Sequence, residues 1–152
     1  MSNYRFYSFT NMYLSSIQKG IQTAHAVSEM YLNSRYSKLH HFDVFNAWAY
    51  SDKTIVVLDG GNQQSLKGIS SIIGDTCLNS YINEDTLHNF PNADFYEDKD
   101  SLNGALTCVG VIVSEAVYNN AKSIREGINV VENFPTYTHE FYKILAYSRL
   151  AN

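Results

Sequence analysis

TIVVLDGGNQQSLKGISSII, residues 54–73, is the stretch from which the fold class follows. Its first five residues, 54–58, form a short continuous apolar run, which is typical of a central strand covered on both faces. Asp59-Gly60-Gly61 ends this strand, and Asn62 can cap a helix that carries the apolar side chains of Leu66, Ile69, Ile72 and Ile73. A strand, a glycine turn and a helix make half of a βαβ unit, so the sequence predicts an α/β fold.

Before this unit, the sequence predicts one strand and two helices. Residues 4–10 alternate aromatic and polar side chains, which indicates an opening strand. Residues 16–33 are expected to form a helix with Ser15 or Ser16 as its N-cap, and its core-facing stripe would consist of Leu14, Ile17, Ile21, Ala24 and Tyr31. Residues 39–51 carry a second helical stripe that we also expect in the core, at Leu39, Phe42, Phe45 and Trp48.

After this unit, the sequence predicts two strands and two further helices. Residues 78–104 are polar, with one short strand expected over 93–96, and residues 105–113, ALTCVGVIV, form the clearest strand of the chain. A helix over 114–128 follows, and Phe134-Pro135 separates it from a last helix over 136–149. Residues 1–152 are therefore expected to form a single domain, with a mixed sheet of about four strands and helices on both faces.

Charge and cysteine content restrict the function classes. The net charge is −4 and only 17% of the residues are charged, which argues against a protein that coats duplex nucleic acid but allows a local pocket for one phosphate. Cys77 and Cys108 are isolated, and the adjacent His40 and His41 would point in different directions on a helix, so we expect reduced thiols and no metal site. With no cofactor motif, signal peptide pattern or apolar membrane-spanning run, the sequence indicates a cytoplasmic protein without a cofactor.

A polar stripe on the first predicted helix is the most informative motif. It consists of Gln18, Gln22, His25 and Glu29, whose spacing of four, three and four residues places them on one side of the helix. The segment LSSIQKGIQTAHAVSEM resembles the first-helix signature of type two peptidyl-tRNA hydrolases, G-K-x-x-A-x-Q-x-x-H-A, with matches at Gln22, Ala24, His25 and Ala26. The order of strand, helix, Trp48, strand 54–58 and the following helix extends this resemblance over residues 4–74.

The sequence departs from that family at positions that matter for the family's function. Family members carry lysines four and six residues before the glutamine, where this chain has Gln18 and Ser16, and Lys19 lies one position away. The nearest counterpart of the family's D-A-G-x-T segment is residues 97–101, EDKDS, in which Asp98 is the candidate acid by position. The last helix, 136–149, is an addition to the family's fold.

Each candidate residue has a functional and a structural interpretation. Ester hydrolysis needs an oriented water and a proton acceptor, which His25 and Asp98 could provide as catalytic residues, whereas a helical histidine is also often a hydrogen-bonded structural group. Lys19 could contact a phosphate or be a solvated lysine, and Gln22 could bind a base or sugar edge or lie exposed. Gln18 and Asn62 are further ligand-binding candidates, although the turn before Asn62 could simply be a tight turn.

The resemblance and its departures lead to three expectations. The first is a degenerate pocket that binds a nucleotide or a tRNA-like RNA end, which in a bacteriophage setting, suggested by the Asn- and Tyr-rich composition, would sequester a host nucleotide signal in the host cytoplasm. The second is an active peptidyl-tRNA hydrolase. The third is a protein that inhibits a host protein by direct binding, using the aromatic last helix. By analogy with the family, a homodimer is expected in each case.

Overall fold

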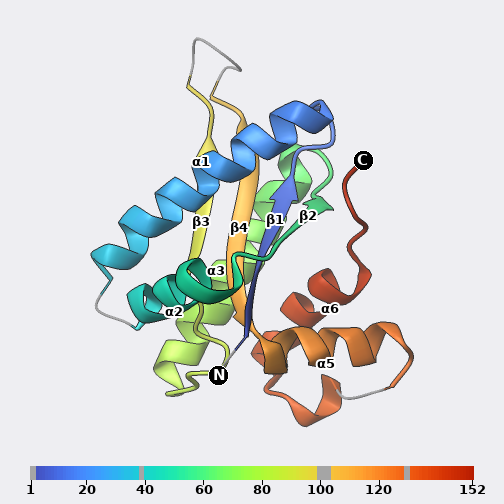
Figure 1. Ribbon diagram of the computed structural model, residues 1–152. Coiled ribbons are helices and arrows are strands. Elements are labelled where there is room, and N and C mark those ends of the chain that lie inside the picture. The colour runs from blue at the N-terminus through green and yellow to red at the C-terminus, as the bar shows by residue number, and fades with distance from the viewer. Residues whose placement is uncertain (1–2, 38–39, 99–103, 129–130) are drawn as a thin grey trace.

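Four strands form one mixed sheet in the order β2-β1-β4-β3 (Figure 1). The computed structural model describes residues 3–37, 40–98, 104–128 and 131–152. The strands are β1 (Tyr4–Thr10), β2 (Ile55–Asp59), β3 (Asn92–Tyr96) and β4 (Leu106–Ser114). β1 pairs with β2 in parallel and with β4 antiparallel, and β3 pairs with β4 antiparallel. The predicted α/β class and the mixed sheet of four strands are confirmed.

The helices begin close to the predicted positions because their caps are local. Five α-helices lie in the described part of the chain: α1 (Ser16–Arg35), α2 (His41–Ala47), α3 (Gln63–Ile82), α5 (Glu115–Arg125) and α6 (His139–Tyr147). Ser15 caps α1, and the Asn62 side chain accepts a hydrogen bond from Ser65 N at the start of α3. The helix expected over 39–51 begins at His41, and Leu39 lies outside the described residues.

Three short helical segments complete the fold. The π-helix η1 (Trp48–Asp52) continues α2, while the 3-10 helices η2 (Val131–Asn133) and η3 (Thr136–Thr138) precede α6. The predicted last helix therefore starts as a 3-10 turn immediately after Pro135 and becomes α-helical at His139. None of the described helices is long and apolar enough to cross a lipid bilayer.

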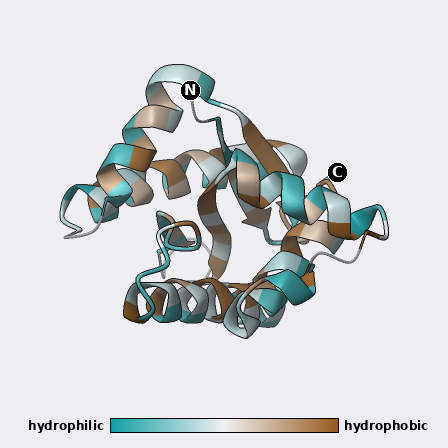
Figure 2. Cartoon of the chain, turned by 90° about the horizontal axis from the view of Figure 1, so that it is seen from below, coloured by the Kyte–Doolittle hydropathy of each residue, from teal (hydrophilic) through white to brown (hydrophobic). Residues whose placement is uncertain are grey.

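The sheet separates two hydrophobic cores. On one face, α1, α2 and η1 enclose a core centred on Phe6, Met30 and Trp48, together with Ala26, Phe45, Ala93, Cys108 and Ile112. On the other face, α3, α5 and α6 cover a larger core that includes Phe9, Leu66, Val111, Phe141 and Leu145. Figure 2 shows brown, hydrophobic segments within the sheet, between the helix layers. Helices on both faces of the sheet are therefore confirmed.

Two expectations about burial are wrong. The strand at 54–58 was expected in the centre of the sheet, but β2 lies at its edge and only Leu58 within it is buried, whereas β4 is central and buried from Leu106 to Val113. The apolar stripe of the first helix was expected in the core, yet 78% of Ile17 is exposed. The sheet-facing side of α1 instead buries Lys19, Gln22, Thr23, Ala26, Met30 and Ser34.

The last five residues form a tail that runs along the outer edge of β2. Asp59 N donates to Arg149 O at 2.8 Å, and Ala151 N donates to Val57 O at 3.0 Å. Leu58 and Leu150 form an antiparallel bridge between these two bonds. The tail thereby reaches the carboxyl ends of β1 and β2, next to the start of α1 (Figure 1).

Candidate functional site

A polar cluster lies between the first half of α1 and the ends of the strands. Gln22 and His25 sit on α1 and face the end of β3 and the start of β4, while Lys19, on the same helix, contacts the tail. Loops at the carboxyl ends of parallel strands are where open α/β sheets usually bind their ligands. The structure therefore brings three of the predicted site residues to a suitable place in the fold.

Both polar ends of the Gln22 amide are engaged by protein atoms. Its Nε2 donates to Glu97 Oε2 at 2.9 Å, and its Oε1 accepts from Thr107 Oγ1 at 2.9 Å. The residue is only 5% exposed. A ligand could bind through this amide only if Glu97 or Thr107 released it, so the predicted contact with a base or sugar edge remains a prediction.

Glu97 takes the position in the cluster that the sequence suggested for Asp98. Its second carboxylate oxygen accepts a hydrogen bond from Asp98 N at 3.2 Å, while the Asp98 side chain belongs to an exposed residue. Sequence reasoning missed Glu97, although the alternation of side chains along a strand offered a signal. Ala93 and Phe95 face α1, and the same two-residue period assigns residue 97 to that side. The remaining positions of the expected acidic segment, 99–101, lie outside the described residues.

The His25 ring is half-buried against an aromatic side chain. It lies 4.6 Å from the Phe95 ring, centroid to centroid, with the two planes at 56°. Nδ1 of His25 is buried and makes no hydrogen bond to any described residue. In the described part of the chain, no carboxylate therefore orients His25 through Nδ1, as a catalytic acid-histidine pair would require.

Lys19 is a nearly buried cation held by the tail. The residue is 7% exposed, and its Nζ donates to the main-chain oxygen of Asn152 at 3.3 Å. An ammonium group has three N–H donors, and the hydrogen bond to Asn152 uses one of them. An anion with several oxygens, such as a phosphate, could form charge-assisted hydrogen bonds with the other two donors.

Gln18 and Asn62, the other two predicted ligand contacts, act as helix caps. Gln18 Oε1 accepts from Ser15 N at 2.9 Å, and Gln18 N donates to Ser15 Oγ at 3.1 Å, which completes a capping box. Asn62 Oδ1 accepts from both the backbone and the hydroxyl of Ser65. These contacts account for the residue types at both positions, and a role in ligand binding remains a prediction.

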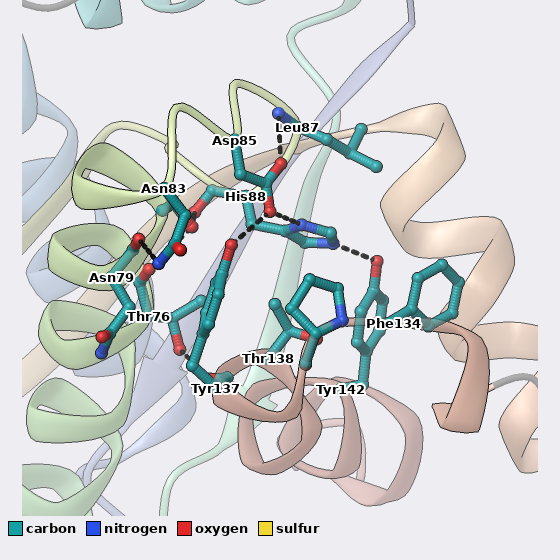
Figure 3. Close-up of polar contacts among 12 residues, drawn as sticks. Thr76, Asn79, Asn83, Asp85, Leu87, His88, Phe134, Tyr137, Thr138 and Tyr142 are labelled. Carbon is teal, nitrogen blue, oxygen red and sulfur yellow. Dashed lines mark hydrogen bonds and ion pairs between the residues drawn. The ribbon is translucent and has the colours of Figure 1, made fainter.

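A second polar network lies on the other face of the sheet, between the last helix and the segment that follows α3 (Figure 3). Because the Asp85 carboxylate can only accept, His88 Nδ1 donates to its Oδ2, at 2.6 Å. The other ring nitrogen, Nε2, then accepts from the Tyr142 hydroxyl at 2.7 Å, and Asn120 Nδ2 donates to that hydroxyl oxygen. Tyr137 also donates to Asp85 Oδ2, at 2.8 Å.

This network, which we call the Asp85–His88 network, is structural because its central atoms are inaccessible. His88 is 2% exposed and Tyr142 is fully buried. Burial raises the pKa of the Tyr142 hydroxyl to about 12, so the phenol remains a donor at neutral pH. The network ties α6 and η3 to the loop before β3, and its hydrogen bonds run in one direction, from Asn120 through Tyr142 and His88 to Asp85.

Acid should weaken the fold through Asp85. Burial alone would raise the pKa of this carboxyl, but the hydrogen bonds from His88 and Tyr137 outweigh burial and hold the pKa below its ordinary value of 3.8. The carboxylate therefore stabilises the fold above the unfolded-state pKa, and this stability is lost as pH falls through the lower folded-state pKa. Urea unfolding followed between about pH 5 and about pH 3 should show a smaller loss in Asp85→Asn than in the wild type. Asp75→Asn, which removes an exposed carboxylate from α3, is the control; equal pH dependence of all three proteins would contradict this assignment.

Neither thiol chemistry nor metal binding is favoured in the described part of the chain. Burial raises the pKa of both thiols, Cys77 and Cys108, to about 11, which keeps them protonated and unreactive at neutral pH. In the ranges that the structure describes, no group of three His, Cys, Asp or Glu side chains is placed to hold a metal ion. The polar cluster on α1 is therefore the candidate site, and its chemistry is that of an ammonium, an amide and a carboxylate.

Comparison of the sequence with models of known protein families finds no family that matches, and a search of curated proteins finds no similar one.

Proposed function

We propose that the protein binds a nucleotide or the end of an RNA chain, with a phosphate at Lys19, in a pocket that resembles a degenerate peptidyl-tRNA hydrolase site. The observation that supports this most directly is the burial of the Lys19 ammonium with one hydrogen bond in the described part of the chain, to the main-chain oxygen of Asn152. A buried cation is costly unless it is paired with an anion or with several acceptors. A phosphate beside Lys19 would supply negative charge and further acceptors, and the nearby start of α1 favours an anion as well.

Binding is a better match to this geometry than hydrolysis. A hydrolase needs a base aligned with a water and donors that are free to meet the developing oxyanion. Here Glu97 and Thr107 hold the Gln22 amide, and Nδ1 of His25 has no acidic partner among the described residues. These contacts favour binding over hydrolysis, because the polar side chains are present but are not arranged as a base, a water and free donors.

The third expectation, a protein that inhibits a host protein by direct binding, depended on the aromatic side chains of the last helix. Phe141 and Tyr142 are buried, however, and Tyr137 is hydrogen-bonded to Asp85. Tyr147 is the exposed aromatic residue of α6. One exposed tyrosine is not a docking surface, because single surface aromatics are common.

Substitution of Lys19 tests the proposal. Isothermal titration with AMP, cyclic diadenylate and a short RNA ending in CCA should show binding of at least one of them to the wild type. Lys19→Met should weaken that binding about tenfold or more, because a hydrogen bond to a charged group contributes roughly 1.5–3 kcal/mol. Lys67→Met removes an exposed lysine of α3 and should leave binding unchanged.

Three outcomes would contradict the proposal. The first is that none of the three probes binds, and the second is an equal loss in the two lysine variants. The third is release of peptide from a peptidyl-tRNA analogue by the wild type, because it would show that the catalytic set is functional. A chain shortened after Ser148 lacks the oxygen that competes for Lys19, so it should bind the same probe more tightly than the full chain.

A further inference from the structure

A cavity of about 400 Å³ opens at the opposite end of the sheet from Lys19. It lies where β1 begins and β4 ends, since Tyr4 and Ser114 are register partners and both line it. Val44, Phe90 and Ile112 provide apolar walls. The described residues around this cavity include no Asp, Glu, Lys or Arg, so its chemistry differs from that of the polar cluster on α1.

Ser114 is placed to cap a helix but does not do so. It is the N-cap residue of α5 with the extended backbone of a cap, φ −76° and ψ 164°, yet its side chain makes no capping hydrogen bond. A serine at this position normally stabilises its helix by accepting from the first turn. Instead its hydroxyl is buried, has no hydrogen-bond partner in the described part of the chain, and belongs to a residue that lines the cavity. A buried hydroxyl without a partner is uncommon and calls for an external one.

Asn89 offers a second polar group to the same cavity. Its Oδ1 accepts from His41 Nε2 at 2.7 Å, since an amide oxygen cannot donate. Burial lowers the pKa of His41, so the ring is neutral at pH 7 and fixes the amide from one side. The NH₂ group of Asn89 makes no hydrogen bond to the residues that the structure describes, and the residue itself is buried at the wall of the cavity.

We propose that this cavity is a binding site for an uncharged, planar heterocycle of the nucleobase type. The Asn89 NH₂ group would donate to an acceptor on the edge of the ring, and the buried Ser114 hydroxyl would turn about its Cα–Cβ bond to meet a neighbouring donor or acceptor. The apolar walls suit the faces of a flat ring, and the aromatic side chains of Tyr4 and His40 stand at the same opening. A volume of this size, mostly apolar and with a few fixed polar groups, is what small-molecule sites share.

The π-helix η1, an uncommon type of secondary structure, holds Tyr4 in position. The π-helix η1 ends at Asp52, whose Oδ2 accepts from Tyr4 N at 2.9 Å. Single π-helical turns occur frequently at functional sites. This contact holds the first residue of β1 at the rim of the cavity, and it does not involve Lys19 or the tail, so the site is independent of the proposed phosphate site.

Ser114→Ala separates a ligand contact from a structural role. Titration of isotope-labelled protein with adenine, uracil and benzamide, followed by NMR, should shift the amide signals of Asn89, Phe90 and Ser114 with at least one probe. Because the hydroxyl has no partner in the described protein, Ser114→Ala should leave the urea midpoint of unfolding unchanged and weaken binding about threefold to tenfold. Ser28→Ala, on the exposed side of α1 and away from the cavity, should leave binding unchanged.

A second variant blocks the opening without touching the core. Thr86 is an exposed residue at the rim, so Thr86→Trp should preserve folding and abolish the shifts. If none of the probes shifts these signals, the cavity holds only solvent and the proposal is wrong. It is equally wrong if a probe binds with the same affinity to wild type, Ser114→Ala and Thr86→Trp, or if Ser114→Ala lowers the urea midpoint, because the hydroxyl would then have a structural partner.

Discussion

His88→Ala is expected to lower the free energy of unfolding by about 3–5 kcal/mol. The imidazole is 2% exposed and bridges the Asp85 carboxylate and the Tyr142 hydroxyl, at 2.6 and 2.7 Å. Its removal leaves a cavity between α6 and the loop before β3, and it also leaves a partly buried carboxylate and a buried phenol without their shared partner. Both effects act in the same direction, so the substitution should be among the most damaging single changes in the chain. Urea denaturation at neutral pH, followed by circular dichroism, measures the loss.

Two matched variants separate the contributions within the Asp85–His88 network. Tyr142→Phe removes only the hydroxyl and should cost about 1–2 kcal/mol, because the ring still fills its place in the core. His41→Ala removes a half-buried histidine with one hydrogen-bonded partner, Asn89, and should cost less than His88→Ala. If His88→Ala and His41→Ala were equally destabilising, the bridging role assigned to His88 would be wrong.

Gly110→Ala is the second large effect that we expect, with a loss of about 1–3 kcal/mol in stability. Gly110 lies in the centre of β4, and a Cβ atom there would approach Cζ of Phe6 to 2.5 Å. Phe6 is fully buried beside Trp48 in the core under α1, so neither the ring nor the strand can move away freely. Thermal or urea unfolding of the purified variant measures the change.

Gly20→Ala is the matched control for that substitution. A Cβ atom at Gly20 meets no atom within 4 Å, and the residue is exposed in the second turn of helix α1. The same chemical change should therefore raise stability there by roughly 0.5–1 kcal/mol, because alanine favours a helix and restricts the unfolded chain. A similar loss in both variants would mean that contact with Phe6 is not the cause.

Local signals in the sequence predicted most of the secondary structure. Capping residues mark where helices start, as Ser15 and Asn62 do here, and these contacts span only three residues. The buried strand β4 was evident from its uninterrupted apolar run. The edge position of β2 was not, because a run of five apolar residues looks the same at the edge of a sheet as at its centre.

The orientation of α1 could not be derived from its own sequence. Apolar spacing selected the side that carries Ile17 and Ile21, but 78% of Ile17 and 48% of Ile21 are exposed. The strands that α1 crosses carry buried polar groups at this point, and the Ser8 hydroxyl is 2.7 Å from that of Thr23. A polar helix face is therefore accommodated there by side-chain hydrogen bonds, and only the later part of the helix, at Ala26 and Met30, packs on an apolar surface.

The candidate site was predicted in part. The stripe of Gln22 and His25 does face the strand ends, and Lys19 lies in the same cluster. The acid that meets Gln22 is Glu97, 75 residues away, and the oxygen at Lys19 comes from a residue 133 positions away. Such pairings depend on loop and tail paths that no local periodicity encodes.

The two hydrogen bonds between the tail and β2 also affect the self-association of the protein. A strand at the rim of a sheet, with unpaired N–H and C=O groups, is a template to which a strand of another molecule can add. In this protein the N–H of Asp59 and the C=O of Val57 are already bonded to Arg149 and Ala151. While the tail remains in place, those two groups are closed to intermolecular strand addition, which protects concentrated solutions of the protein against aggregation along that side.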